Sequence, residues 1–285
     1  MKPAPFKLVR PTTVAEACAA LAEHGEDARV LAGGQSLVPT MNFRLSQPTV
    51  LVDLERVEGL DSVSRRNGDL AVGAMVRQRD AERNDVIRED APLISVALPF
   101  VGHVQNRNRG TIGGSIAHAD PAAELPAVAI AAGARVRLVS SGSEREVPAL
   151  DFFEGPFMTT IEHGEIVTEV VFPARSGVRV SLQELARRHG DFAIAGVAVI
   201  VELDGEGVVS NIGSGAFGVT SSVIKLPAVE SEVVGRRLDA ATIKNAARAA
   251  ANEPQRVTDD THASEAYRRE LLGTMVGRAL ADVAD

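Results

Sequence analysis

A pair of consecutive glycines, Gly33 and Gly34, lies where a predicted strand ends, in the string LAGGQSL at 31–37. Consecutive glycines let the backbone approach a ligand closely, and their successive N–H groups can form a nest that holds an anion. A diphosphate would suit such a nest, although a tight turn without a ligand explains a glycine pair on its own more simply. The string matches neither G-x-G-x-x-G nor G-x-x-x-x-G-K-[ST], so a Rossmann or P-loop site is not supported.

A second string, GTIGGSIAHADPAAELP at 110–126, holds another glycine pair. The pair is Gly113 and Gly114, and the hydroxyls of Thr111 and Ser115 flank it. Two carboxylates follow, Asp120 and Glu124, which could accept hydrogen bonds from ribose-like or ribityl hydroxyls. Just upstream, Arg107 and Arg109 would either add positive charge or form a solvated basic loop. Two loops suited to a diphosphate in one chain favour a ligand site over two unrelated turns.

The strings AGGQSL and TIGGSIAHADPAAELP resemble the two flavin-binding signatures of the FAD-binding medium subunit of molybdenum hydroxylases, the family of carbon monoxide dehydrogenase and of the flavin domain of xanthine dehydrogenase. Two more segments resemble the same family, FKLVRPTTVAEA at 6–17 and ARRHGDFAIAGVA at 186–198. The resemblance therefore spans nearly the whole chain, and four signatures in order make coincidence improbable.

The resemblance implies FAD bound without a covalent link, and it implies which residues hold it. The first string would wrap the diphosphate, through Ala32, Gly33, Gly34, Gln35, Ser36 and Leu37. The second would contribute Thr111, Gly113, Gly114 and Ser115. Positions that pack near the flavin or surround its ring match Val101, Val167, Arg188, Asp191 and Phe192. The two valines, as apolar residues, are core residues by default, and the other three could equally be structural.

Two carboxylates depart from the family pattern. Glu124 stands where the family usually has Asp, at a position implied to bind the polyol region of the flavin. Glu184 stands where related sequences often have Lys near the flavin ring. Because a carboxylate there would disfavour an anionic reduced flavin that a lysine would favour, no lysine role transfers to this chain.

No residue of the chain is expected to act as a catalytic acid, base or metal ligand. His103 and His118 have no second His or Cys at metal-ligand spacing. The single cysteine, Cys18, cannot hold an iron–sulfur cluster or a disulfide, and its place on an apolar helical face predicts a small buried side chain. The redox chemistry would therefore belong to the FAD.

Composition indicates which binding partners and which cellular compartment are compatible with the chain. The net charge of −8 argues against nucleic acid, because a phosphate backbone needs a basic face. Aromatic residues make up 4%, with no Trp, which disfavours a base-stacking platform or sugar groove. The N-terminal residues lack the apolar core of a signal peptide, no apolar run reaches membrane-spanning length, and the single cysteine fits a reducing cytoplasm.

The elements that must position these residues follow from periodicity. Residues 13–24 predict a helix with a Thr13-x-x-Glu16 capping box, followed by strands at 29–32 and 50–54. Turn dipeptides at 67–68, 141–142 and 204–205 predict hairpins. Residues 166–219 are mostly strand-like, and 240–251 and 264–282 have helical patterns.

These elements agree with the fold that the resemblance implies: an α+β protein with two α/β subdomains in a PCMH-type FAD-binding fold, followed by a C-terminal domain of antiparallel sheet and helices. The loop PARSG at 173–177 places a boundary that gives domains 1–175 and 176–285. A softer boundary divides the first domain into subdomains 1–55 and 56–175.

The resemblance implies an electron-transfer subunit of a cytoplasmic complex. A large subunit would carry molybdopterin, a small subunit two [2Fe-2S] clusters, and the assembly would be a dimer of heterotrimers. Carbon monoxide, purines, N-heteroaromatics and aldehydes stay open as substrates, and so does the final acceptor. A self-sufficient flavin oxidase or reductase of the related fold is the alternative, and a scaffold without a cofactor would leave both signatures unexplained.

Overall fold

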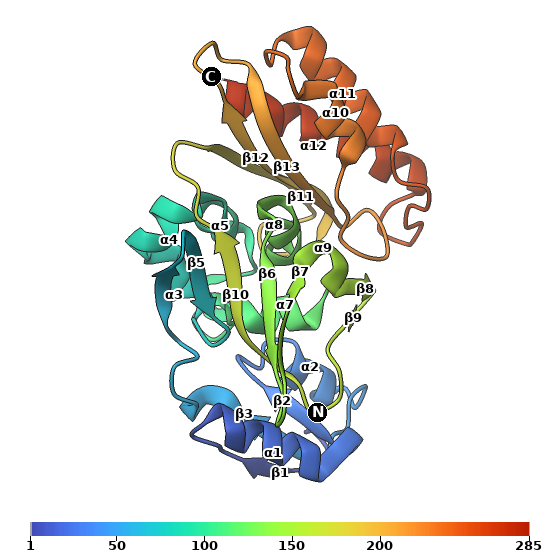
Figure 1. Ribbon diagram of the computed structural model, residues 1–285. Helices are drawn as coiled ribbons and strands as arrows, with labels where there is room; N and C mark the ends of the chain where they lie inside the picture. The colour runs from blue at the N-terminus through green and yellow to red at the C-terminus, as the bar shows by residue number, and fades with distance from the viewer. Residues whose placement is uncertain (1, 285) are drawn as a thin grey trace.

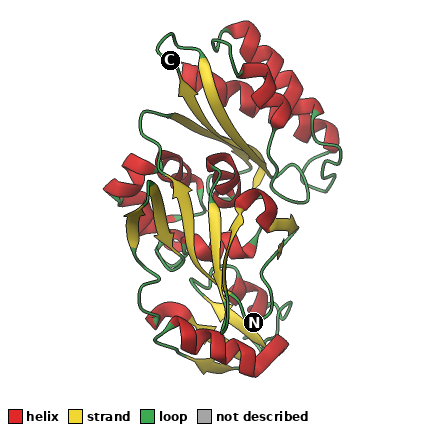
Figure 2. Cartoon of the chain, viewed as in Figure 1, coloured by secondary structure: helices red, strands yellow, loops and turns green. Residues whose placement is uncertain are grey.

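The computed structural model describes residues 2–284. The chain builds three parts that follow one another along the long axis of the molecule, from the N-terminal part at the bottom of Figure 1 to the C-terminal part at the top. Figure 2 shows that each part combines sheet and helices. This mixed architecture confirms the predicted α+β class.

The N-terminal part is a small parallel sheet of order β1-β3-β2 that is crossed by one helix. Thr13 caps that helix in the predicted capping box with Glu16. The helix buries Cys18 completely, and the Cys18 Sγ lies 3.4 Å from the Val139 carbonyl oxygen of the next part. The elements are β1 (Lys7–Val9), α1 (Val14–His24), η1 (Gly25–Asp27), β2 (Ala28–Leu31), α2 (Leu37–Asn42), β3 (Val50–Asp53) and η2 (Leu54–Arg56).

The middle part is an antiparallel sheet of order β4-β5-β10-β6-β7. Asn67 and Gly68 both have positive φ in the turn between β4 and β5, which confirms the predicted hairpin. The strands are β4 (Val63–Arg66), β5 (Asp69–Gly73), β6 (Arg135–Val139), β7 (Glu144–Pro148), β8 (Phe153–Gly155), β9 (Met158–Thr159) and β10 (Ile166–Pro173). The helices are α3 (Gln78–Arg83), α4 (Asp85–Asp90), α5 (Pro92–Ala97), η3 (Leu98–Phe100), α6 (Val104–Arg107), α7 (Ile112–His118), α8 (Glu124–Ala132) and α9 (Ala149–Phe152).

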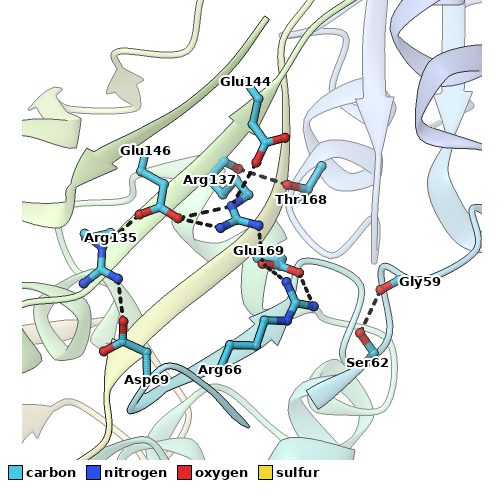
Figure 3. A network of polar contacts seen from close by, with 10 residues as sticks. All are labelled: Gly59, Ser62, Arg66, Asp69, Arg135, Arg137, Glu144, Glu146, Thr168 and Glu169. Carbon is cyan, nitrogen blue, oxygen red and sulfur yellow. Dashed lines mark hydrogen bonds and ion pairs between the residues drawn. The ribbon is translucent and has the colours of Figure 1, made fainter. Parts of the chain in front are cut away.

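The two faces of the middle sheet differ in chemistry. One face packs against helices α7 and α8. The other carries a ladder of ion pairs that crosses all five strands (Figure 3). In this ladder Arg137 is 2.7 Å from Glu146 and 3.3 Å from Glu169, and Arg135 is 2.7 Å from Asp69. Cross-strand pairs of opposite charge stabilise a sheet and fix its register.

The C-terminal part is a three-stranded antiparallel sheet, β11-β12-β13, with three helices on one face. Its other face lies against α8, so α8 is enclosed between two sheets and each of its residues is buried. The elements are β11 (Arg179–Ala186), β12 (Ala193–Leu203), β13 (Val209–Phe217), α10 (Pro227–Val233), α11 (Ala240–Asn252) and α12 (Glu265–Ala284). The strands and the last two helices confirm the predicted pattern of 166–282.

Candidate functional site

The first loop, residues 32–37, offers a row of unpaired backbone donors. Within the described residues 2–284, no backbone N–H group from Gly33 to Leu37 has a protein acceptor. Gly34 has a φ of 73°, a left-handed conformation that glycine adopts without strain. Five successive N–H groups that lack acceptors at the start of α2 form the kind of concavity that binds a diphosphate. The residues present therefore fit the diphosphate of FAD.

The second loop, residues 110–115, is built differently. Thr111 caps α7, and its Oγ1 accepts from the Gly114 N–H at 3.0 Å. The N–H groups of Ile112 and Gly113 donate to the carbonyl oxygens of Val76 and Ala74. The second glycine pair therefore does not supply a nest of unpaired N–H groups, because these groups are used to join α7 to the end of β5. A contribution of Thr111 and Ser115 to FAD would come from their hydroxyls.

The two loops are in direct contact, and the glycines allow it. A Cβ at Gly33 would overlap the Arg109 carbonyl oxygen, and a Cβ at Gly114 would lie 3.4 Å from Ala32 Cβ. Glu55, at the end of the N-terminal part, is 3.2 Å from Arg77 and 3.6 Å from Arg109. The structure thus brings both predicted strings together at the junction of the N-terminal and middle parts.

Arg107, which sequence alone left as a candidate donor of charge, is instead structural. Its guanidinium is buried, pairs with Glu82 at 3.0 Å and donates to the carbonyl oxygens of Val101 and Gly102. Arg107 therefore holds the 101–106 segment in place. Val101 is half-buried against the core, and Val167 on β10 belongs to the core itself, so both pack as apolar residues.

The turn between β11 and β12 reaches the same region. Gly190 in this turn lies against His103, because a Cβ at Gly190 would be 2.6 Å from the His103 ring. Asn106, one turn after His103, donates to Gln35 of the first loop at 3.3 Å. The predicted ring residues lie on this turn: Arg188 is exposed, Asp191 is half-buried, and Phe192 has 73% of its surface exposed.

Two carboxyls of the site have raised pKa values, the buried Glu124 and the half-buried Glu184. Glu124 begins α8 and is 7% exposed. Burial, with a smaller effect of the Asp120 charge, raises the pKa of Glu124 to about 7. Burial and the charge of Glu124 raise the pKa of Glu184 to about 8. The two carboxyls, which sequence analysis treated as separate departures from the family pattern, are therefore close enough for the charge of Glu124 to raise the pKa of Glu184.

Three contacts were not foreseen from sequence. The Phe157 ring, on the turn between β8 and β9, lies 5.1 Å from the His118 ring, and burial lowers the pKa of His118. The Pro121 carbonyl oxygen accepts from the Gly218 N–H at 2.7 Å and so ties the second signature to the C-terminal part. Asn106 is the third. The contact of Asn106 with Gln35 follows the Gly102-His103 turn before α6, and this turn carries no sequence motif that would have indicated the contact.

The geometry places a row of unpaired N–H groups, suited to an anionic group such as a diphosphate, where the two loops meet. Comparison with known proteins gives the family. Residues 4–175 match the model of the FAD binding domain in molybdopterin dehydrogenase, and residues 180–283 match that of the CO dehydrogenase flavoprotein C-terminal domain. The chain belongs to the family of FAD-binding medium subunits of molybdenum hydroxylases, as its four signatures implied.

Individual relatives are similar over their full length. The chain is 40% identical to the 6-hydroxypseudooxynicotine dehydrogenase complex subunit alpha of Paenarthrobacter nicotinovorans, covering 99% of this chain and 95% of that one. It is 35% identical to the glyceraldehyde dehydrogenase medium chain of Sulfolobus acidocaldarius, covering 100% of both. The structure of carbon monoxide dehydrogenase from Hydrogenophaga pseudoflava superposes with a TM-score of 0.96 at 35% identity, covering 99% of this chain and 98% of that one.

These relatives are subunits of dehydrogenase complexes, so this chain is an oxidoreductase subunit with an FAD-binding domain. Within residues 2–284, no helix is long and apolar enough to cross a membrane. The same residues contain no group of three or more His, Cys, Asp or Glu side chains placed to hold a metal ion.

Proposed function

We propose that this chain takes electrons from [2Fe-2S] clusters of a partner subunit into bound FAD and passes them to an external acceptor. The observation that carries the proposal is the row of unpaired N–H groups at residues 33–37, in contact with the second signature. A single, buried cysteine means that any cluster that supplies electrons lies on another chain.

The site proposed for FAD combines the residues singled out from sequence. The first loop holds the diphosphate through its backbone, while Thr111, Ser115 and Glu124 bind hydroxyl groups. Arg188, Asp191 and Phe192 line the ring from the C-terminal part, and Val101 and Val167 support it from the core. FAD supplies the redox chemistry, and the chain supplies binding and orientation.

We also propose the division of the chain and its assembly. The division is into domains 1–175 and 176–285, with subdomains 1–55 and 56–175, and the loop PARSG at 173–177 supports the main boundary. The hydrophobic clusters cross these boundaries, since Leu182 and Phe217 pack in the middle cluster and Ile166 in the N-terminal one. The partners are a large molybdopterin subunit and a small iron–sulfur subunit in a dimer of heterotrimers, located in the cytoplasm. Relatives named for an alkaloid derivative and for glyceraldehyde leave the substrate of this complex open.

Stopped-flow mixing tests the electron transfer. The FAD-loaded chain is mixed, without oxygen, with an iron–sulfur subunit whose clusters have been reduced. The absorbance of the oxidised flavin at about 450 nm is followed. Rapid bleaching is expected, and its absence would contradict the proposal. In parallel, the isolated loaded chain is mixed with carbon monoxide, a purine, an N-heteroaromatic and an aldehyde. Bleaching by any of these alone would favour the self-sufficient oxidase.

A further inference from the structure

The side chain of Glu184 is half-buried, and its Oε2 atom is shielded from solvent. Its Oε2 atom has no hydrogen-bond partner within the described residues. A buried polar atom without a partner costs about 1–3 kcal/mol, so native structures keep few of them, and each needs an explanation. Glu184 is close enough to Glu124, a residue of the proposed FAD site, for the Glu124 charge to act on it. A polar atom of the cofactor is therefore a partner that would satisfy the Oε2 atom.

Alternation along β11 determines which way Glu184 points. Ser181 and Gln183 face the C-terminal helices, where both donate to Asp282 of α12 at 2.9 and 2.6 Å. Leu182 belongs to the core cluster that includes α8, on the opposite face. Successive side chains of a strand point to opposite faces, so Glu184 points with Leu182 toward the middle part and Glu124.

The groups around Glu184 do not neutralise a negative charge there. Its register partner on β12 is Gly196, and α5, which packs against β11, carries no titratable residue. The nearest element that contributes charge is the start of α8, with Glu124 and, before it, Asp120. Within residues 2–284, Glu184 forms no ion pair with the basic residues of the following turn, Arg187, Arg188 and His189.

We propose that Glu184 is a further residue of the FAD site, where its neutral carboxyl group donates a hydrogen bond to the cofactor, so that FAD binding takes up a proton at alkaline pH. The proposal rests on the FAD site proposed above and not on electron transfer. The diphosphate brings negative charge to a site that already holds two carboxyls, and a like charge favours the protonated acid. Since burial and Glu124 already raise the pKa of Glu184 to about 8, the bound cofactor raises it further.

The linkage between proton binding and FAD binding determines how FAD affinity changes with pH. Where the pKa of Glu184 is higher in the FAD complex than in the free chain, the complex binds more protons, and the dissociation constant of FAD rises with pH by up to about tenfold per pH unit. With a pKa of about 8 in the free chain, we expect the dissociation constant to rise by up to about tenfold between pH 6.5 and pH 9.

Flavin fluorescence titrations of the full chain test this expectation in three forms. Glu184→Gln keeps a neutral donor of the same shape, so it should bind FAD at pH 6.5 like the wild type but lose most of the rise toward pH 9. Glu253→Gln is the matched control, because Glu253 also has a raised pKa and an unpartnered buried oxygen but caps α10 through the Ala228 N–H. It should keep the full rise. An equal rise in the Glu184 variant would overturn the proposal.

A measurement on the wild-type chain does not depend on whether the variant folds. Titration calorimetry at pH 8 in two buffers of different ionisation enthalpy counts the protons bound with FAD. Because Glu184 with a pKa of about 8 is already half protonated in the free chain at pH 8, an uptake of up to about half a proton per FAD is expected there and much less at pH 6.5. No uptake at pH 8 would overturn the proposal. If FAD binds with proton uptake but reduced clusters do not bleach it, the electron-transfer function fails while this inference stands.

Discussion

At the scale of single residues, the glycines of the two signatures have different tasks. Gly34 gives the first loop its left-handed turn, whereas Gly33 and Gly113 allow close approach of backbone: a Cβ at Gly33 would overlap Arg109, and one at Gly113 would lie 2.4 Å from Ala74 Cβ. The signature therefore preserves the contact between the loops as much as the contact with a ligand.

Replacement of Gly33 by Ala tests this view. Because the new Cβ meets backbone, the loops must separate, and we expect a loss of about 2 kcal/mol of stability together with an FAD affinity lower by at least about tenfold. Gly142→Ala is the control, since nothing lies within 4 Å of its Cβ position in the β6–β7 turn. Urea unfolding and FAD titration measure both effects. Unchanged FAD affinity in Gly33→Ala would mean that the contact between the loops does not shape the site.

The buried carboxyl of Glu124 gives a second prediction, made for the FAD-free chain. The pKa of Glu124 is raised to about 7 in the folded chain, above its ordinary value of 4.5, so its ionisation lowers stability progressively from about pH 4.5 to pH 7. Glu124→Gln should therefore gain about 1–3 kcal/mol relative to wild type at pH 8 and lose this advantage near pH 4.5.

Glu146→Gln should show the opposite pH dependence. Arg137 and Arg135 hold the pKa of Glu146 below its ordinary value, so its ionised form stabilises the fold, and that contribution disappears as the pH falls. The Gln variant should be less stable than wild type at pH 8, with the difference shrinking toward acid pH. Thermal unfolding at both pH values measures the two variants. The same trend in both would contradict the assignment.

Residue types indicated the first loop but not the pairing of Glu124 with Glu184. The string AGGQSL predicts an anion nest, and the chain has the unpaired N–H groups that such a nest needs. The identical reasoning for Gly113 and Gly114 is wrong in its detail, because the Gly113 N–H donates to the distant Ala74 carbonyl oxygen and the Gly114 N–H to Thr111 Oγ1. The carboxyl pair depends on a contact between two parts of the chain, and no spacing along the sequence encodes that contact.

At the scale of elements, helix α8 connects the middle and C-terminal parts. Its nine residues are all buried between two sheets. On β13, Gly213 and Gly215 face this helix, and a Cβ at either would overlap a carbonyl oxygen of α8. Glycines at alternate positions of a strand indicate that another backbone segment approaches closely. The string GSG at 213–215 gives this signal, but it does not identify the segment that approaches.

Gly215→Ala should therefore force α8 away from β13. We expect a loss of about 2 kcal/mol and weaker FAD binding, because Glu124 begins the helix that moves. Gly205→Ala, in the turn between β12 and β13, is the matched control, with nothing within 4 Å of its Cβ position. Urea unfolding with FAD titration makes the comparison, and equal stability of the two variants would contradict the tight packing.

Long or strongly patterned elements were predictable, and short ones were not. The capping box and apolar face of α1, the Asn67-Gly68 turn and the helix α12 follow from local rules. The helices α3 to α7 are four to seven residues long, too short for a helical period to be visible in sequence. Their positions come from packing: α7 lies against β5, β10 and α8, α5 lies against α8 and β11, and α3, α4 and α6 pack against neighbouring short helices.

At the scale of the whole molecule, the candidate site draws on all three parts. The first loop belongs to the N-terminal part, Thr111 and Glu124 to the middle part, and Glu184 to the C-terminal sheet. The parts are joined there by few polar contacts, among them Asn106 to Gln35 and Gly218 to Pro121. A cofactor held at this junction would add contacts that each part lacks alone.

FAD should therefore stabilise the three parts together and not one of them. A ligand that binds only the folded state adds about 2.7 kcal/mol when its free concentration is one hundred times its dissociation constant. For a chain of 285 residues, we expect this to raise the melting temperature by about 4 °C. Calorimetry with and without FAD, together with hydrogen exchange of the amides in β3, β10 and β12, measures the shift and its distribution. Gly33→Ala, with FAD affinity about tenfold lower, should keep only about half of the shift at the same FAD concentration. Protection confined to the strands of one part would show that the cofactor binds to that part alone, because a ligand protects only the amides whose exposure requires its release.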